Sequence, residues 1–229
     1  MQSSNKRMQL RKKRKRQRRL LILLCALFII LGIVGSVKIY KLIFPEGAIE
    51  HFNKTRRVEL ARELEIPSFI DVQYIHKHTT ARTCMELSEI NNIVIHYVGN
   101  PNTTAQNNRD YFNKADTTVS SHFVIGLDGE IIQCLPLYER SAASNNRNGD
   151  TISIEVCHSD ETGEFNDVTY KSLIKLCVYI CNNLSLDEND IIRHYDITGK
   201  ICPKYYVENE DAWNKFKKDL KNELNEKKE

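Results

Sequence analysis

The stretch Ile93-Val94-Ile95-His96-Tyr97-Val98 decides the fold class of this 229-residue chain. It is a short and almost wholly apolar run, which is typical of a strand buried on both faces of a sheet. His96 is the exception, because a polar side chain near the end of such a strand is costly unless it is paired or ligated. The neighbouring segments are therefore searched for the elements that cover the sheet and for the residues that pair with His96.

Downstream of this strand, apolar runs and amphipathic segments alternate. The Asp128-Gly129 dipeptide separates two apolar runs and predicts a hairpin. Further strands are predicted at 152–156 and from Ile191, and helices at about 103–114, 167–184 and from Glu210. The sequence therefore predicts an α/β fold with a mixed central β-sheet flanked by helices.

The segment Arg193-His-Tyr-Asp-Ile-Thr-Gly-Lys-Ile-Cys-Pro203 supplies possible partners for His96. A lone strand histidine is more often a hydrogen-bonded core residue, but His96, His194 and Cys202 lie together at predicted strand and loop ends. Two imidazoles and one thiolate suit Zn²⁺, and three protein ligands leave a position open for water or substrate. We predict that these three residues are zinc ligands.

Two further residues are candidates for catalysis. Glu155 lies in the otherwise small or apolar strand 152–156, where it could act as an acid or base beside a metal-bound water or could face solvent. Lys200 precedes Cys202 by two positions. In an extended loop its side chain would point to the metal side, although a solvated loop lysine is the commoner case.

The chain from about residue 67 to 206 resembles the zinc-dependent N-acetylmuramoyl-L-alanine amidases of the phage-lysozyme and peptidoglycan recognition protein superfamily (amidase type 2). The resemblance rests on 95–97, 120–125, 129–133, 151–157 and 194–203. It implies the peptidoglycan recognition protein-like amidase fold, with His96, His194 and Cys202 as the zinc ligands. It implies Glu155 as the catalytic acid/base and Lys200 as the oxyanion-stabilising residue. The implied reaction is hydrolysis of the amide bond between N-acetylmuramic acid and L-alanine in peptidoglycan.

The chain departs from this family pattern at one position. Many members carry a catalytic Tyr where this sequence has Ser121, just before His122. The proton-transfer role then falls to Glu155, and His122 is expected behind the site. Some members of the superfamily bind peptidoglycan without cutting it, so a non-catalytic sensor or receptor is the alternative. Such binders typically lack the ligand Cys, which this chain keeps.

The N-terminal region predicts a membrane anchor. The first 19 residues carry ten Lys or Arg and no acid, and Leu20 to Val37 is an uncharged run of 18 residues. At about 1.5 Å per residue this run just spans a hydrocarbon core of roughly 30 Å. We expect a cytoplasmic basic segment at 1–19, a transmembrane signal anchor at 20–44 and an extracellular catalytic domain, in a single-pass protein of the bacterial cell membrane.

Other interpretations of this region are less favoured. A basic arm for nuclear localisation or RNA binding would not need the adjoining apolar run. A cleaved signal peptide would have a shorter apolar region and an Ala-x-Ala-like site. Without the twelve basic residues of positions 1–41, the rest of the chain carries 21 basic and 30 acidic residues, a net charge of −9. This acidic remainder argues against nucleic acid as a partner.

The rest of the chain divides into a charged stalk at 45–66, with some helix before Pro67, and one domain at 67–229. Seven cysteines give no regular disulfide pattern. Cys25 falls in the predicted span and Cys202 in the predicted metal site. The remaining five are expected to be mostly small buried residues: Cys84, Cys134, Cys157, Cys177 and Cys181.

Overall fold

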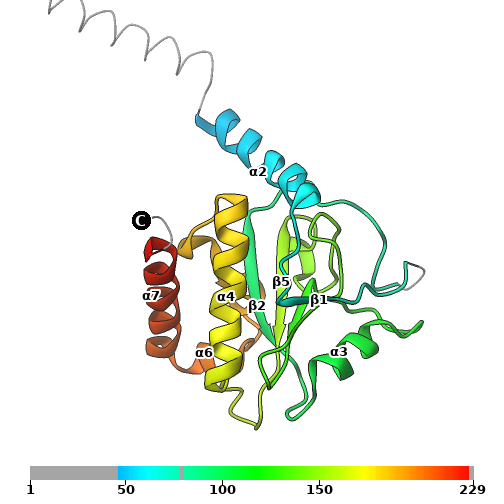
Figure 1. Ribbon diagram of the computed structural model, residues 1–229, viewed down its shortest axis with the longest axis vertical. Helices are drawn as coiled ribbons and strands as arrows, with labels where there is room; N and C mark the ends of the chain where they lie inside the picture. Colours follow the sequence, from blue (N-terminus) through cyan, green and yellow to red (C-terminus); the bar gives the residue numbers. More distant parts are fainter. Residues whose placement is uncertain (1–45, 78–79, 227–229) are drawn as a thin grey trace, which may run out of the picture. The chain divides into compact units, whose positions relative to one another are not determined.

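The computed structural model describes residues 46–77 and 80–226 (Figure 1). The predicted basic segment 1–19 and the predicted span 20–44 lie outside this range. Within the described ranges, no helix has both the length and the apolar character that a membrane crossing requires. The described residues from His51 onward form one compact unit.

The centre of this unit is a six-stranded sheet in the order β1-β4-β3-β5-β2-β6. Only the β3–β4 pair is antiparallel, so the sheet is mixed, as predicted. The predicted hairpin is confirmed, since β3 and β4 flank Gly129, whose φ of 80° suits a residue without a Cβ. The strands are β1 (Ile70–Val72), β2 (Asn92–Tyr97), β3 (Phe123–Ile125), β4 (Ile131–Gln133), β5 (Thr151–Val156) and β6 (Ile191–Arg193).

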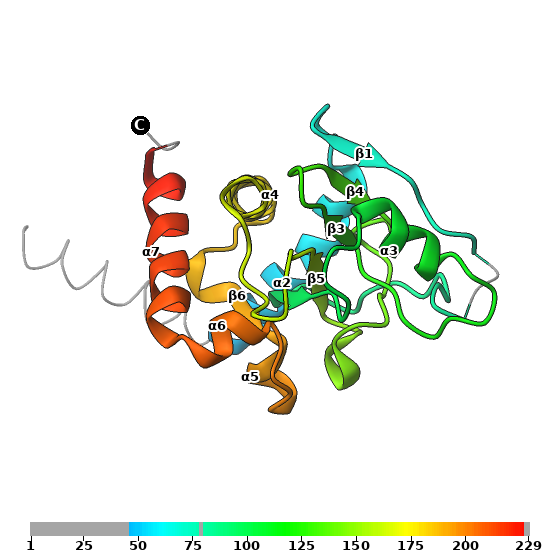
Figure 2. The same cartoon turned by 90° about the horizontal axis from the view of Figure 1, so that it is seen from below.

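Helices cover both faces of the sheet (Figure 2). Helices α4 (Asp167–Leu184) and α7 (Glu210–Glu226) pack into the larger apolar cluster, which takes Ile93 and Ile95 of β2. Helix α3 (Ala105–Phe112) packs into a smaller cluster on the other face with Val124 and Ile132. Strands β2, β3, β4 and β5 therefore bury side chains in both directions, as an unbroken apolar run predicts, whereas Asp71 and Val72 of the edge strand β1 are exposed.

The helix ends follow local sequence signals. Asn166 caps α4 by accepting hydrogen bonds from the backbone N–H groups of Val168 and Thr169, so the helix has the predicted bounds. Thr104 and Asn107 form a reciprocal capping box at the start of α3, which is shorter than the predicted 103–114. Two short helices, α5 (His194–Thr198) and α6 (Lys204–Glu208), follow β6 and flank the loop that contains Cys202.

The segment expected to be a stalk, 45–66, contains helix α2 (Glu46–Glu63), and much of this helix packs on the sheet domain. Val58 and Ala61 are buried in the larger cluster. The Arg57 guanidinium donates to the carbonyl oxygens of Ile90, Leu184 and Ser185 at 2.8–3.0 Å. The compact unit therefore starts at His51, earlier than the expected boundary at residue 67.

Candidate active site

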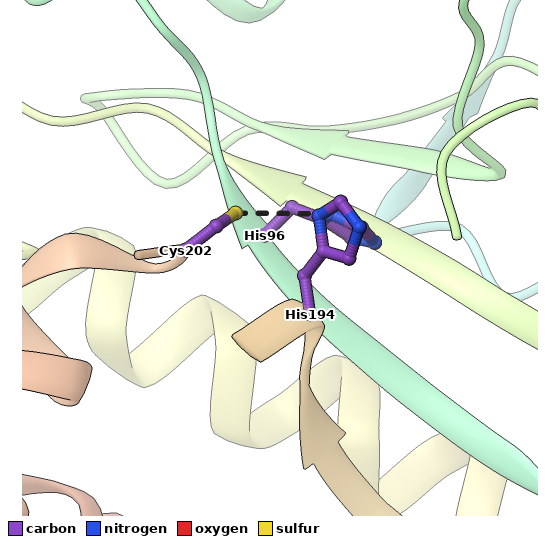
Figure 3. A group of neighbouring side chains, drawn as sticks. All are labelled: His96, His194 and Cys202. Atoms are coloured by element: carbon purple, nitrogen blue, oxygen red, sulfur yellow. Dashed lines mark hydrogen bonds between the residues drawn. The ribbon is translucent and has the colours of Figure 1, made fainter. Parts of the chain in front are cut away.

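Two segments far apart in the sequence bring His96, His194 and Cys202 together (Figure 3). His96 lies near the carboxyl end of β2, and His194 opens α5 directly after β6. Cys202 follows the α5 turn, and its carbonyl accepts a hydrogen bond from the backbone N–H of Tyr195 at 2.9 Å. One ligand atom from each residue lies within 4.8 Å of the others. His96 Nδ1 is 3.8 Å from Cys202 Sγ.

Burial keeps both imidazoles in the neutral form that a metal ligand requires. Burial lowers the pKa of His96 well below its ordinary value, and His194 and Lys200 act in the same direction. Burial and Lys200 also lower the pKa of His194. Burial raises the pKa of the Cys202 thiol to about 12, while the backbone N–H of Tyr97 and the charge of Lys200 act against the increase. A cation beside Cys202 Sγ would lower the pKa of the thiol more strongly, because a positive charge favours the thiolate.

The Nε2 atoms of both imidazoles contact the same turn. This turn consists of Ser144 and the short 3₁₀ helix η1 (Asn145–Arg147). His194 Nε2 lies 2.8 Å from Asn145 Oδ1, and His96 Nε2 lies 3.5 Å from Ser144 Oγ. His194 Nδ1, in contrast, is buried and has no hydrogen-bond partner in the described part of the chain. An unpartnered buried nitrogen beside a second imidazole and a thiol fits a metal ion, which would take its lone pair.

Glu155 lies beside this cluster on the neighbouring strand. It is the register partner of His96 in the parallel β2–β5 pair and of Val124 in the β3–β5 pair. The side chain is half-buried, and its Oε2 is buried with no hydrogen-bond partner among the described residues. Burial raises the pKa of Glu155 to about 8, against the opposing charge of Lys200. A carboxyl group in this state can both accept and donate a proton near neutral pH.

A cleft of about 490 Å³ opens over these residues. Its lining includes the three metal-site residues, Glu155 and the exposed Lys200 at one end. It continues along α3, where Asn107 and Tyr111 line it, to Lys114 just beyond the helix. Its other wall includes Val119, Ser120 and Ala142. A cleft of this size accommodates a ligand larger than a single amino acid.

Several residues weighed from the sequence lie outside the cleft lining. Ser121 is fully buried, and its hydroxyl donates to Ser153 Oγ at 3.1 Å. His122 is also fully buried: its Nε2 lies 2.8 Å from the Glu139 carbonyl, and its Nδ1 accepts from the Ser153 N–H at 3.0 Å. His158 stacks on Tyr97, and its ring nitrogens lie within 2.8 Å of the carbonyl oxygens of Val98 and Asp160. These histidines support the fold around the site.

The cysteines expected to be small buried residues are buried, except Cys84, which is exposed. All six cysteines within the described residues are free thiols. Ser144 and Asn145 did not emerge from the sequence, because a polar turn carries no periodic pattern. The only signal for them is the asparagine-rich run Ser144-Asn-Asn-Arg-Asn148, which is typical of a turn.

Comparison with known proteins identifies the family. The model of the amidase family described as N-acetylmuramoyl-L-alanine amidase matches residues 86–205. The chain belongs to this family. The matched range contains all five candidate residues: His96, Glu155, His194, Lys200 and Cys202.

Curated relatives and solved structures agree with this assignment. N-acetylmuramoyl-L-alanine amidase BlyA of Bacillus subtilis (strain 168) is 31% identical over 175 residues, which are 67% of this chain and 47% of BlyA. Amidase CwlL of Bacillus licheniformis is 27% identical over 171 residues, again 67% of this chain and 47% of the relative. The chain therefore spans about half the length of these relatives. The catalytic domain of XlyA is 25% identical with a TM-score of 0.59, and the match covers 66% of this chain and 98% of that domain.

Proposed function

We propose that this protein is a zinc-dependent N-acetylmuramoyl-L-alanine amidase that hydrolyses the amide bond between N-acetylmuramic acid and L-alanine in peptidoglycan. One observation carries the proposal. The buried cluster of His96, His194 and Cys202 lies beside Glu155 in one cleft, and among the described residues one imidazole nitrogen and one carboxyl oxygen there have no hydrogen-bond partner. The family and the relatives named above support the substrate class.

His96, His194 and Cys202 would hold the zinc ion. Zinc, when bound, supplies a Lewis acid that polarises the scissile carbonyl and lowers the pKa of water to about 7. Glu155 takes the proton from the attacking water at Oε2 and later donates it to the nitrogen of the departing L-alanine. Its raised pKa suits both steps, since the group gains and loses a proton near neutral pH. The Lys200 ammonium stabilises the negative charge that develops on the carbonyl oxygen.

The polar wall of the cleft suits a peptide-bearing sugar. Asn107 uses its Oδ1 in the α3 capping box, so its amide N–H₂ remains available to a ligand in the cleft. Tyr111 presents an exposed ring, and Lys114 adds positive charge. Amide, aromatic and cationic side chains are groups that recognise peptide carbonyls, sugar faces and carboxylates.

We also propose that residues 20–44 anchor the protein in the bacterial cell membrane, with the N-terminus in the cytoplasm and the domain outside. Within the domain, the cleft lies away from helix α2, whose Arg57 contacts Ile90 on the amino side of β2. His96 lies six residues further along the chain, so the cleft opens roughly 20 Å away, at the carboxyl end of the strand. Retention of the chain in alkali-washed membranes supports the anchor, and release into the wash contradicts it.

The activity is tested on the full chain, purified in detergent and with its metal counted. The chain is incubated with muramoyl-peptide fragments, and mass spectrometry detects free stem peptide with a new L-alanine amine. Release that is lost with a chelator and restored by Zn²⁺ is the expected result. Bound zinc and fragment binding without release would instead indicate a non-catalytic peptidoglycan sensor.

A further inference from the structure

The turn at Asn145 has an unusual backbone conformation. Asn145 has a φ of 54°, in the left-handed region that residues other than glycine rarely adopt and that asparagine tolerates better than most. Residues other than glycine in this region cluster at active sites and at positions that hold a ligand. The Asn145 side chain reaches His194, with its Oδ1 2.8 Å from His194 Nε2.

This contact determines which nitrogen of His194 carries the proton. A carbonyl oxygen only accepts hydrogen bonds, so His194 Nε2 must donate. A neutral imidazole has a single N–H, and the lone pair therefore lies on Nδ1. That nitrogen is the buried atom without a partner in the described residues, and a bound metal would need its lone pair.

The turn is held in place by contacts that do not involve the metal cluster. Asn148 Oδ1 accepts hydrogen bonds from the backbone N–H groups of Ala143 and Ser144 at 3.1 and 2.6 Å. Arg147 donates to Asp150 at 2.7 and 2.9 Å and to Asn92 Oδ1 at 2.7 Å. These hydrogen bonds hold the turn from which the Asn145 side chain projects.

We propose that Asn145 is a positioning residue of the metal centre, which holds His194 in the tautomer and ring orientation that present Nδ1 to a metal ion. The inference rests on the proposed zinc site and extends it to a residue outside the ligand set. Outer contacts of this type are generally worth roughly 10–100-fold in metal affinity.

The test compares two substitutions in the full metal-free chain, with zinc affinity measured by competition with a chromophoric chelator. Asn145→Gly removes the acceptor and tolerates a φ of 54°, so the backbone strain is relieved and not increased. We expect roughly 10–100-fold weaker zinc binding with an unchanged melting temperature of the metal-free chain. Asn145→Asp keeps an acceptor oxygen and should restore the affinity.

Asn102→Gly is a matched control, because Asn102 has nearly the same φ, 58°, and does not line the cleft. It should leave zinc affinity unchanged. Equal zinc affinity in Asn145→Gly and the unmodified chain would overturn the inference while leaving the proposed function intact. An unmodified chain that binds no zinc would instead remove the zinc-dependent function itself.

A second measurement does not depend on any variant being folded. Nitrogen-15 NMR of the metal-free, histidine-labelled full chain reports which ring nitrogen of His194 is protonated. A proton on Nε2 is the expected result. A proton on Nδ1 would overturn the inference, because Asn145 would then present its amide N–H₂ to the ring.

Discussion

His96 and Glu155 are register partners on the adjacent parallel strands β2 and β5. Partners in this register project to the same face, which here is the face on which α3 packs and the cleft opens. Parallel strands end at the same edge of a sheet, where ligand sites of α/β proteins are commonly found. The pairing therefore places a candidate metal ligand and a candidate proton carrier side by side without any help from a flexible loop.

Glu155→Gln should abolish hydrolysis and retain the fold and the zinc. Glutamine is close in shape to glutamate but cannot carry the proton, so a loss of roughly 10²–10⁴-fold in turnover is expected. Turnover of muramoyl-peptide and zinc content are measured together. Glu223→Gln, at an exposed position on α7, is the control and should behave like the unmodified chain. A zinc-loaded Glu155→Gln variant with full activity would exclude Glu155 from proton transfer.

Lys200→Ala should lower kcat far more than it changes KM. The ammonium is proposed to act on charge that develops only in the transition state, and loss of one such donor typically costs about 10²–10³-fold in kcat. Steady-state kinetics on a soluble muramoyl-peptide separate the two parameters. Lys171→Ala, at an exposed site on α4, is the matched control. A rise in KM at constant kcat would assign Lys200 to substrate binding instead.

The sequence predicted the central parts of the fold because they depend on local patterns. The apolar run at 93–98 gave β2, Asp128-Gly129 gave the hairpin, and the apolar stripe at 167–184 gave α4. The convergence of His96, His194 and Cys202 was predictable too, since the two histidines lie at the ends of elements and Cys202 lies in the loop that follows His194. Their role as zinc ligands and the membrane anchor stay predictions.

Features that depend on tertiary partners were not predictable. Helix α2 packs on the domain through Val58 and Ala61. Its Arg57 donates hydrogen bonds to the carbonyl oxygens of Ile90, Leu184 and Ser185. No pattern within 45–66 encodes those distant carbonyl oxygens. Asn145 is similar, because its importance comes from a left-handed backbone and a contact with His194, 49 residues away.

Arg82→Ala should destabilise the protein strongly. Arg82 and Glu139 form a buried bidentate pair with N···O distances of 2.7 and 2.8 Å, and Arg82 also donates to the Ile75 carbonyl. Loss of one partner leaves an unpaired buried charge, at a cost of about 3–5 kcal/mol in the free energy of unfolding. Urea denaturation of the full chain measures this value.

Two comparison variants make the Arg82 result specific. The double change Arg82→Met with Glu139→Leu removes both charges and should cost less than Arg82→Ala alone. Lys221→Ala breaks the Lys221–Glu188 pair, in which Lys221 is exposed and Glu188 is half-buried, and should have a much smaller effect. A double variant less stable than Arg82→Ala would mean that packing, and not the unpaired charge, dominates at this position.

His122 should make the stability of the domain sensitive to acid. Burial lowers the pKa of His122 from 6.5 to about 4 in the folded protein. His122 Nδ1 accepts a hydrogen bond from the Ser153 backbone N–H. Protonation of Nδ1 would remove this acceptor and place two N–H groups opposite each other. Between about pH 6.5 and 4 the unfolded chain binds this proton and the folded chain does not, so the free energy of unfolding falls as the pH falls. The loss approaches roughly 3 kcal/mol near pH 4.

Urea denaturation of the unmodified chain and of His122→Gln between pH 7 and 4.5 measures this loss of stability. Because other titrating groups cancel in the comparison, the stability advantage of the unmodified chain should shrink on acidification. A constant difference across this range would mean that His122 does not change its protonation on unfolding.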